Sequence, residues 1–265
     1  LPDASSFPTA RADALSAAAG LAYWLADAER SRGHYEAEIA AREELGDRKG
    51  LAEAHYGVSF TWSIIEVTNK RNAENAERHI NTALAIFREL DDAFGIGRCE
   101  WALANVQWGT RQPAEAREHA LHALSLFESI NDSFMVGWAS YTLGIAALAI
   151  AQDEGDPQSW LGEARRRLGD ALRVFHEAQD LTGYSLVFDG LAIVAQREGR
   201  LDRAAKLSGI VSALEKVSET GLGLWNREVL EFDAQRLRDD PKLAVEWAAG
   251  EALTTDEAVA FALGE

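Results

Sequence analysis

Proline is scarce in this chain, and so are the alternating runs of Val, Ile and Thr that are typical of β-strands. Only 5 of the 265 residues are proline. Ala, Leu and Glu dominate instead, and these residues favour helices over strands. Apolar residues make up 47% of the chain and charged residues 26%, which are ordinary values for a globular domain. The composition therefore predicts an all-α fold with a packed core.

Cysteine occurs once, at Cys99. A single cysteine excludes a framework of intramolecular disulfides. Cys99 falls in the apolar stripe of an expected helix, where a thiol is by default buried and unreactive. We therefore expect Cys99 to be a core residue and not a catalytic nucleophile.

Positive charge is also in deficit, with 26 Lys and Arg against 43 Asp and Glu and a formal net charge of -17. Nucleic acid and anionic membranes attract basic surfaces, so neither is expected as a direct partner. The sequence indicates no apolar run long enough to span a bilayer and no signal peptide at its start. Because the sequence begins at Leu1 and not at Met, we expect a fragment of a longer, cytoplasmic protein.

The common motifs of enzyme chemistry are missing. There is no Gly-x-x-x-x-Gly-Lys-Ser/Thr phosphate loop and no His-Glu-x-x-His metal motif, and Ser, His and Asp are too scattered for a triad. His119 and His122 stand three residues apart, but polar residues recur at the repeat position of His119 (His79 and Arg167), which favours a surface position over a metal site. We expect no catalytic residue, no cofactor and no metal, and we interpret the chain as non-enzymatic.

Four acidic residues reveal a repeat. Asp47, Asp92, Asp132 and Asp180 each follow one expected helix and begin another, where a carboxylate caps the helix and suits its dipole. The helices that precede Asp92, Asp132 and Asp180 share an Ala-Leu step followed by an aliphatic-Phe step. The Ala-Leu steps lie at 83–84, 123–124 and 171–172, and the aliphatic-Phe steps lie at 86–87, 126–127 and 174–175. This spacing of 40 to 48 residues predicts about five helical hairpins.

The sequence divides into three regions: a linker at 1–10, a helical repeat array at 11–217 and a C-terminal helical cap at 218–265. Within the cap we predict a loop through Asn226 and then a helix over 227–239. Thr254 and Glu257 have the spacing of a capping box, which predicts the start of a last helix. The open end of a repeat array must be covered, so a capping role fits this region.

The hairpins resemble tetratricopeptide repeats of a long kind. Ser140-x-x-Leu143-Gly144, and Leu103-Ala104 followed by Ala116 and Ala123, match the alternation of small and large residues in that repeat. The resemblance implies a right-handed α-solenoid.

A narrower resemblance covers nearly the whole chain. The segments DRKGLAEAHYGVSF, DSFMVGWASYTLGIAAL and AQDLTGYSLVFDGLA, and the tail from Trp247 to Leu263, are similar to the C-terminal region of actinobacterial-type signalling regulators. In that family a STAND-type ATPase module precedes the repeats, and a cyclase-like, winged-helix or LuxR-type DNA-binding domain lies elsewhere. The resemblance implies a sensor or interaction arm, and it makes the upstream ATPase module a candidate partner.

In tetratricopeptide arrays the first helix of each pair lines a concave groove. The repeat register places eight candidate ligand or partner residues there: Tyr56, Arg98, Trp101, Asn105, Trp108, Trp138, Tyr141 and Asp189. Aromatic rings offer large contact area at low entropic cost, and polar groups beside them fix orientation. The alternative is that these rings fill the core of a tight superhelix.

Two functions remain open. The first is a non-catalytic interaction or sensor domain of a larger signal-transduction or transcriptional regulator, which binds a protein or peptide in the groove. The second is a small-molecule effector domain, which predicts a closed pocket near Trp101, Trp108 and Trp138.

Overall fold

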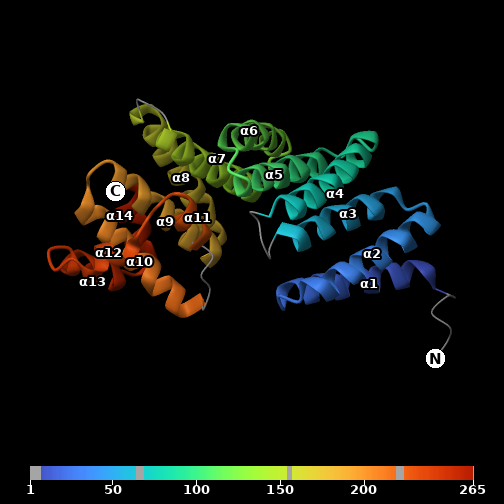
Figure 1. Cartoon of the computed structure of the whole chain (residues 1–265), viewed down its shortest axis with the longest axis horizontal. Coiled ribbons are helices and arrows are strands. Elements are labelled where there is room, and N and C mark those ends of the chain that lie inside the picture. Colours follow the sequence, from blue (N-terminus) through green and yellow to red (C-terminus); the bar gives the residue numbers. More distant parts are fainter. Residues whose placement is uncertain (1–6, 64–68, 154–156, 219–223, 265) are drawn as a thin grey trace. The chain divides into compact units, whose positions relative to one another are not determined.

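The computed structural model describes residues 7–63, 69–153, 157–218 and 224–264. Within these ranges all regular structure is helical, which confirms the all-α prediction (Figure 1). The helices are α1 (Pro8–Trp24), α2 (Ala28–Leu45), α3 (Arg48–Ser63), α4 (Lys70–Glu89), α5 (Ala93–Gly109), α6 (Pro113–Ser129), α7 (Ser133–Asp153), α8 (Gln158–Ala178), α9 (Leu181–Arg197), α10 (Leu201–Ser218), α11 (Leu224–Val229), α12 (Ala234–Asp239), α13 (Ala244–Glu251) and α14 (Thr255–Leu263).

Consecutive helices pack in pairs: α1 with α2, α3 with α4, α5 with α6, α7 with α8, and α9 with α10. The described residues thus contain five hairpins, as the repeat spacing predicts. The chain forms two compact units, residues 1–130 and 131–265. The predicted linker at 1–10 falls partly outside the described residues, and α1 begins within it at Pro8, because proline suits the first turn of a helix.

A two-residue turn starts four of the predicted helices. The first residue of each turn has a left-handed backbone conformation, with φ between 52° and 66°. These residues are Gly46, Asp91, Asn131 and Gln179. The next residue is the predicted aspartate, whose carboxylate accepts a backbone N–H three residues on: Asp47 from Gly50 at 2.9 Å, Asp92 from Gly95 at 2.9 Å, Asp132 from Met135 at 3.0 Å, and Asp180 from Gly183 at 3.2 Å. The capping role of all four is confirmed.

Each repeated phenylalanine packs against a glycine. Phe87 is fully buried, and a Cβ on Gly95 would lie 2.3 Å from its ring. Phe175 has the same relationship with Gly183, also at 2.3 Å. Both glycines follow a capping aspartate by three residues, so the start of one helix accommodates the ring of the helix before it. This contact explains the glycine at these two repeat positions.

Two helices form the centre of the second unit. α9 is buried from Gly183 to Ala195, on all sides. α7 is apolar on two sides, and over Ser133–Gln152 it is long and apolar enough to cross a membrane by length and composition. The prediction that no stretch has that length is therefore wrong for α7. However, 72% of the most apolar window is buried inside the unit, as is typical of a core helix.

The C-terminal region differs in part from the predicted one. A helix begins at Leu224, within the predicted loop, and the helix predicted over 227–239 is two short helices, α11 and α12. The break lies between Glu231, which is left-handed at φ 55°, and Asp233, which caps α12 by accepting the N–H of Arg236 at 3.1 Å. The predicted capping box of Thr254 and Glu257 is confirmed at the start of α14.

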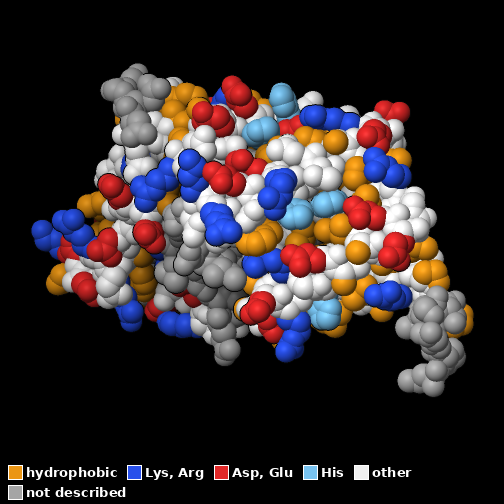
Figure 2. Space-filling model, turned by 45° about the vertical axis from the view of Figure 1, so that its right-hand side comes forward, with side chains coloured by type: hydrophobic (Ala, Val, Ile, Leu, Met, Phe, Trp, Pro, Cys, Tyr) orange, Lys and Arg blue, Asp and Glu red, His pale blue; other side chains and the backbone are white. Residues whose placement is uncertain are grey.

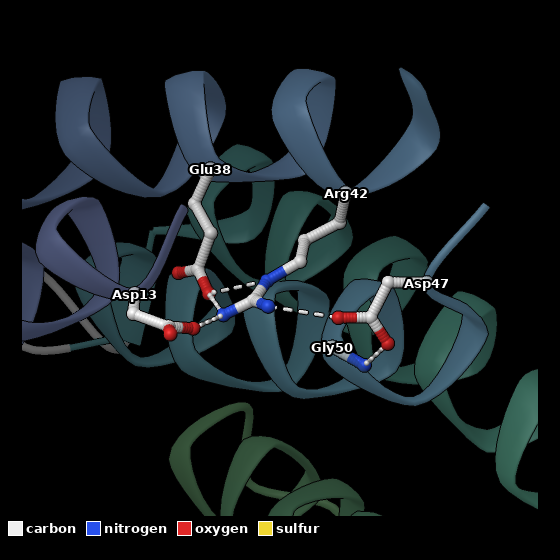
Figure 3. Close-up of polar contacts among 5 residues, drawn as sticks. All are labelled: Asp13, Glu38, Arg42, Asp47 and Gly50. Carbon is white, nitrogen blue, oxygen red and sulfur yellow. Dashed lines mark hydrogen bonds and ion pairs between the residues drawn. The ribbon is translucent and has the colours of Figure 1, made fainter. Parts of the chain in front are cut away.

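In the first unit, Arg42 connects the first two helices to the start of the third (Figure 3). From α2 it donates to Asp13 of α1 at 2.7 Å and to Asp47 at 2.8 Å, while Asp47 also caps α3 through Gly50. Burial raises the pKa of the neighbouring Glu38 carboxyl, and the charge of Arg42 opposes this effect. The first hairpin is thus held in register with the next helix by one guanidinium group.

Candidate partner-binding surfaces

Four half-buried rings form an aromatic row in the first unit. Tyr23 comes from α1, Tyr56 and Phe60 from α3, and Trp101 from α5. The ring centroid of Phe60 lies 6.4 Å from that of Tyr23, 5.0 Å from Tyr56 and 6.3 Å from Trp101. These are the first helices of three consecutive hairpins. The repeat register therefore brings two of the predicted residues, Tyr56 and Trp101, into one contiguous row.

Arg98 places an ion pair beside this row. Its guanidinium lies 4.6 Å from the centre of the Tyr56 ring and donates to Glu53 at 2.5 Å. A cation over an aromatic face is held by the ring quadrupole, so the rotamers of both groups are restricted. The Nε of Arg98 is buried and has no hydrogen-bond partner among the described residues. Burial also raises the pKa of Tyr56, so its hydroxyl is neutral at physiological pH.

The other two predicted residues of this unit differ from Tyr56 and Trp101 in their contacts or burial. Asn105 donates its side-chain amide to the backbone oxygen of Trp101 at 2.8 Å, within its own helix. Trp108 is buried, at 7% exposed, which fits the alternative that some rings fill the core. The aromatic row therefore consists of Tyr23, Tyr56, Phe60 and Trp101, with Arg98 beside it.

In the second unit, Trp138 and Tyr141 of α7 contact each other at 6.0 Å between ring centroids. Trp138 is half-buried and lies 4.8 Å from Phe175. Tyr141 is buried, and its hydroxyl accepts a hydrogen bond from Asn226 of α11 at 2.5 Å. The predicted groove position of Tyr141 is thus covered by a later segment of the same chain.

Asp189 of α9 is covered by the same segment. It is 1% exposed, and its Oδ1 accepts a hydrogen bond from Nε of Arg227 at 2.8 Å. The Nη2 of Arg227 donates to Glu215 of α10 at 2.9 Å. Burial raises the pKa of Asp189 to about 6, against the opposing charge of Arg227. This buried cluster stabilises the position of α11 and does not resemble an acid–base pair open to substrate.

Asn226, Arg227 and Glu215 were not among the predicted residues. They lie far along the sequence from the residues they contact, and each reads locally as an ordinary polar position on a helix. No local pattern marks them. Only the aspartate at position 189, unusual in an otherwise apolar helix, indicates that a partner must exist.

Three of the histidines contact each other or a carboxylate of the first unit. His119 contacts the buried Glu100 carboxylate at 2.7 Å, and Arg88 donates to the other oxygen of that carboxylate at 3.1 Å. His55 and His79 meet at 2.9 Å between their Nδ1 atoms. In the part of the chain that the structure describes, no group of three or more His, Cys, Asp and Glu residues could hold a metal ion.

The surface carries no single dominant charge on the face that Figure 2 shows, where acidic and basic side chains are interspersed. No protein-family model matches the chain, and no curated protein matches it. The aromatic row and the cluster around Asp189 are therefore the features that bear on function.

Proposed function

We propose that the chain is a non-catalytic helical-repeat domain of the tetratricopeptide type, a right-handed α-solenoid, that binds a protein or peptide partner along the aromatic row of the first unit. The proposal places it as the interaction arm of a larger cytoplasmic signalling regulator, with that regulator's ATPase module among the candidate partners.

The aromatic row is the observation that supports this proposal. Its rings come from the first helix of each of three successive hairpins, which is the arrangement of the recognition surface in tetratricopeptide arrays. Half-buried rings are fixed by the fold and still offer apolar contact area, so a bound segment loses little of its affinity to ordering the protein side. The ion pair of Arg98 and Glu53 adds a polar group of each sign beside the rings, which favours a peptide over a purely apolar ligand.

Binding should be tested with a peptide library selected on the full chain. The selected peptides are then measured by fluorescence anisotropy against wild type, Trp101→Ala and Tyr56→Ala. We expect each substitution to weaken binding about 10-fold or more, as for aromatic anchors at interfaces. Leu21→Ala is the control, because Leu21 is an exposed apolar residue of the same unit outside the row.

Circular dichroism and thermal melts accompany these measurements. We expect Trp101→Ala to keep the helical content and most of the melting temperature. Peptides that bind wild type and Trp101→Ala equally would contradict the proposal, and so would unfolding of Trp101→Ala and Tyr56→Ala, since both rings would then be core residues.

A further inference from the structure

The carboxylate of Asp189 is incompletely satisfied. It is 1% exposed, yet among the described residues only Oδ1 is hydrogen-bonded, to Nε of Arg227, while Oδ2 has no hydrogen-bond partner there. Buried polar atoms almost always have partners, and an ionised carboxylate can accept several hydrogen bonds. The carboxylate of Asp189 can thus accept more hydrogen bonds than Arg227 supplies.

Arg227 does not fill the hydrogen-bonding capacity of the Asp189 carboxylate, because its guanidinium also donates to Glu215. Nε faces Asp189, and Nη2 faces Glu215 of α10 at 2.9 Å. An arginine that approached a carboxylate edge-on would donate two parallel bonds, one to each oxygen. The pKa of Asp189, raised to about 6 by burial, agrees with a carboxylate whose desolvation Arg227 only partly offsets.

The segment that carries Arg227 is short and is held largely by side chains. α11 has six residues, Leu224–Val229, too few for a helix that is stable alone. Asn226 donates to the hydroxyl of Tyr141 at 2.5 Å, and Arg197 donates to the backbone oxygen of Leu230 at 3.0 Å. Val229, Leu230 and Phe232 are buried beside these contacts. The segment therefore binds the second unit as a small peptide ligand would.

We propose that Asp189 and Glu215, which hold Arg227, and Tyr141, which accepts from Asn226, form a recognition site for an Asn-Arg pair, filled in this structure by Asn226 and Arg227, that also accepts the same pair from a peptide segment of a protein partner. The ligand is a peptide in which Asn-Arg is followed, after one intervening residue, by apolar residues, since Val229 and Leu230 stand there and are buried. The proposal concerns the second unit and is independent of the aromatic row in the first.

The test uses the full chain with Asn226→Ala and Arg227→Ala together, which removes the two side chains that fill the site. A labelled peptide of residues 224–232, Leu-Trp-Asn-Arg-Glu-Val-Leu-Glu-Phe, is titrated into it and followed by anisotropy. We expect this double variant to bind the peptide at least 10-fold more tightly than wild type, whose site is already filled. Arg236→Ala, at an exposed arginine of α12, is the control and should behave as wild type.

Two changes identify the contact with Asp189. Replacing the arginine of the peptide by alanine, or adding Asp189→Asn to the double variant, should weaken binding about 10- to 100-fold, the usual effect of losing a hydrogen bond to a charged group. A folded double variant that does not bind the peptide would overturn the proposal. So would binding that is indifferent to the peptide arginine and to Asp189.

Hydrogen exchange on wild type covers the case in which the double variant does not fold. The amides of Leu230 and Phe232 donate to the backbone oxygens of Asn226 and Arg227, so they report whether the segment stays formed. An excess of the arginine-containing peptide should accelerate their exchange at least 3-fold, and the alanine version should not. Equal exchange with both peptides would overturn the proposal.

Discussion

Gly209 of α10 and Gly250 of α13 bring the backbones of their two helices into contact. A Cβ on Gly209 would lie 2.1 Å from the carbonyl oxygen of Trp247, and a Cβ on Gly250 would lie 2.0 Å from the carbonyl oxygen of Lys206. Both distances are far shorter than any real contact of a methyl group, and both clashing atoms belong to backbone that cannot rotate away. The contact between α10 and α13 therefore requires glycine at both positions, because any other residue would place its Cβ against the backbone of the facing helix.

Gly209→Ala should destabilise the protein by about 3 kcal/mol, because the helices must separate to admit the methyl group. Urea unfolding followed by circular dichroism measures this change. Gly162→Ala is the matched control, since Gly162 is also helical but its added Cβ would meet nothing within 4 Å apart from its chain neighbours and the backbone of its own helix. Gly162→Ala should increase the free energy of unfolding by up to about 1 kcal/mol, because alanine has a higher helix propensity than glycine. Equal effects at both glycines would show that α10 and α13 do not cross so closely.

Leu143→Ala should cost on the order of 2–5 kcal/mol, because Leu143 is fully buried at the centre of α7 and its truncation leaves a cavity. The same unfolding experiment applies. Val245→Ala, at a residue that is 73% exposed, should change the free energy of unfolding by less than about 0.5 kcal/mol. If Leu143→Ala lowered the free energy of unfolding only slightly, the repeat register assigned to α7 would be wrong.

Glu251 should contribute stability that acid removes. It accepts hydrogen bonds from Lys216 and Ser212, both at 2.8 Å, and these contacts lower its pKa from 4.5 to about 2. The folded state therefore binds this proton less readily than the unfolded state, so the contribution is complete above pH 4.5 and is lost as the pH falls towards 2. Glu251→Gln should cost on the order of 1 kcal/mol at pH 7, since Lys216 is mostly exposed.

The comparison of wild type with Glu251→Gln from pH 7 to pH 2 tests this prediction. The difference between the two free energies of unfolding should shrink across that range. A difference that stays constant down to pH 2 would show that the carboxylate charge does not act in the folded state.

His79 should make the first unit sensitive to mild acid. Burial, and then the adjacent His55 and Arg78, lower its pKa from 6.5 to about 4, while burial also lowers the pKa of His55, opposed by Glu43. Since the folded state disfavours the proton on His79, its stabilising effect is present above pH 6.5 and is lost as the pH falls from 6.5 to 4.

His79→Gln should flatten the dependence of the melting temperature on pH across that window, and His34→Gln, far from this pair in sequence and partly exposed, should leave it unchanged. NMR titration of the imidazole protons gives an independent measurement. A pKa near 6.5 for His79 in the folded protein would contradict the prediction.

The helices and their caps could be predicted because their causes are local. Asp92 and Gly95 are three residues apart, and the ring that requires Gly95 belongs to Phe87, eight residues before it. A repeat shows the same solution several times, so a single sequence is enough to recognise it. The aromatic row follows from this register too, because Tyr56 and Trp101 occupy the same place in neighbouring hairpins.

What escaped prediction is set by contacts between distant parts of the chain. Asp189 and Arg227 are 38 residues apart, and Tyr141 and Asn226 are 85 residues apart. Helical periodicity shows which side of α7 or α9 a residue occupies, but it does not show what covers that side. The split between α11 and α12 escaped for another reason, since a charged run reads as one helix and the left-handed backbone of Glu231 has no sequence marker.

Cys99 gives this protein a practical advantage for spectroscopy. The thiol is fully buried, and burial raises its pKa to about 12, so at neutral pH it is protonated and shielded from maleimide reagents. Any cysteine introduced at the surface will then be the one reactive thiol among the described residues, without first replacing the native one. A fluorophore at the exposed Glu228 of α11, paired with a second at the exposed Leu181 of α9, would report in real time whether an added peptide displaces the segment.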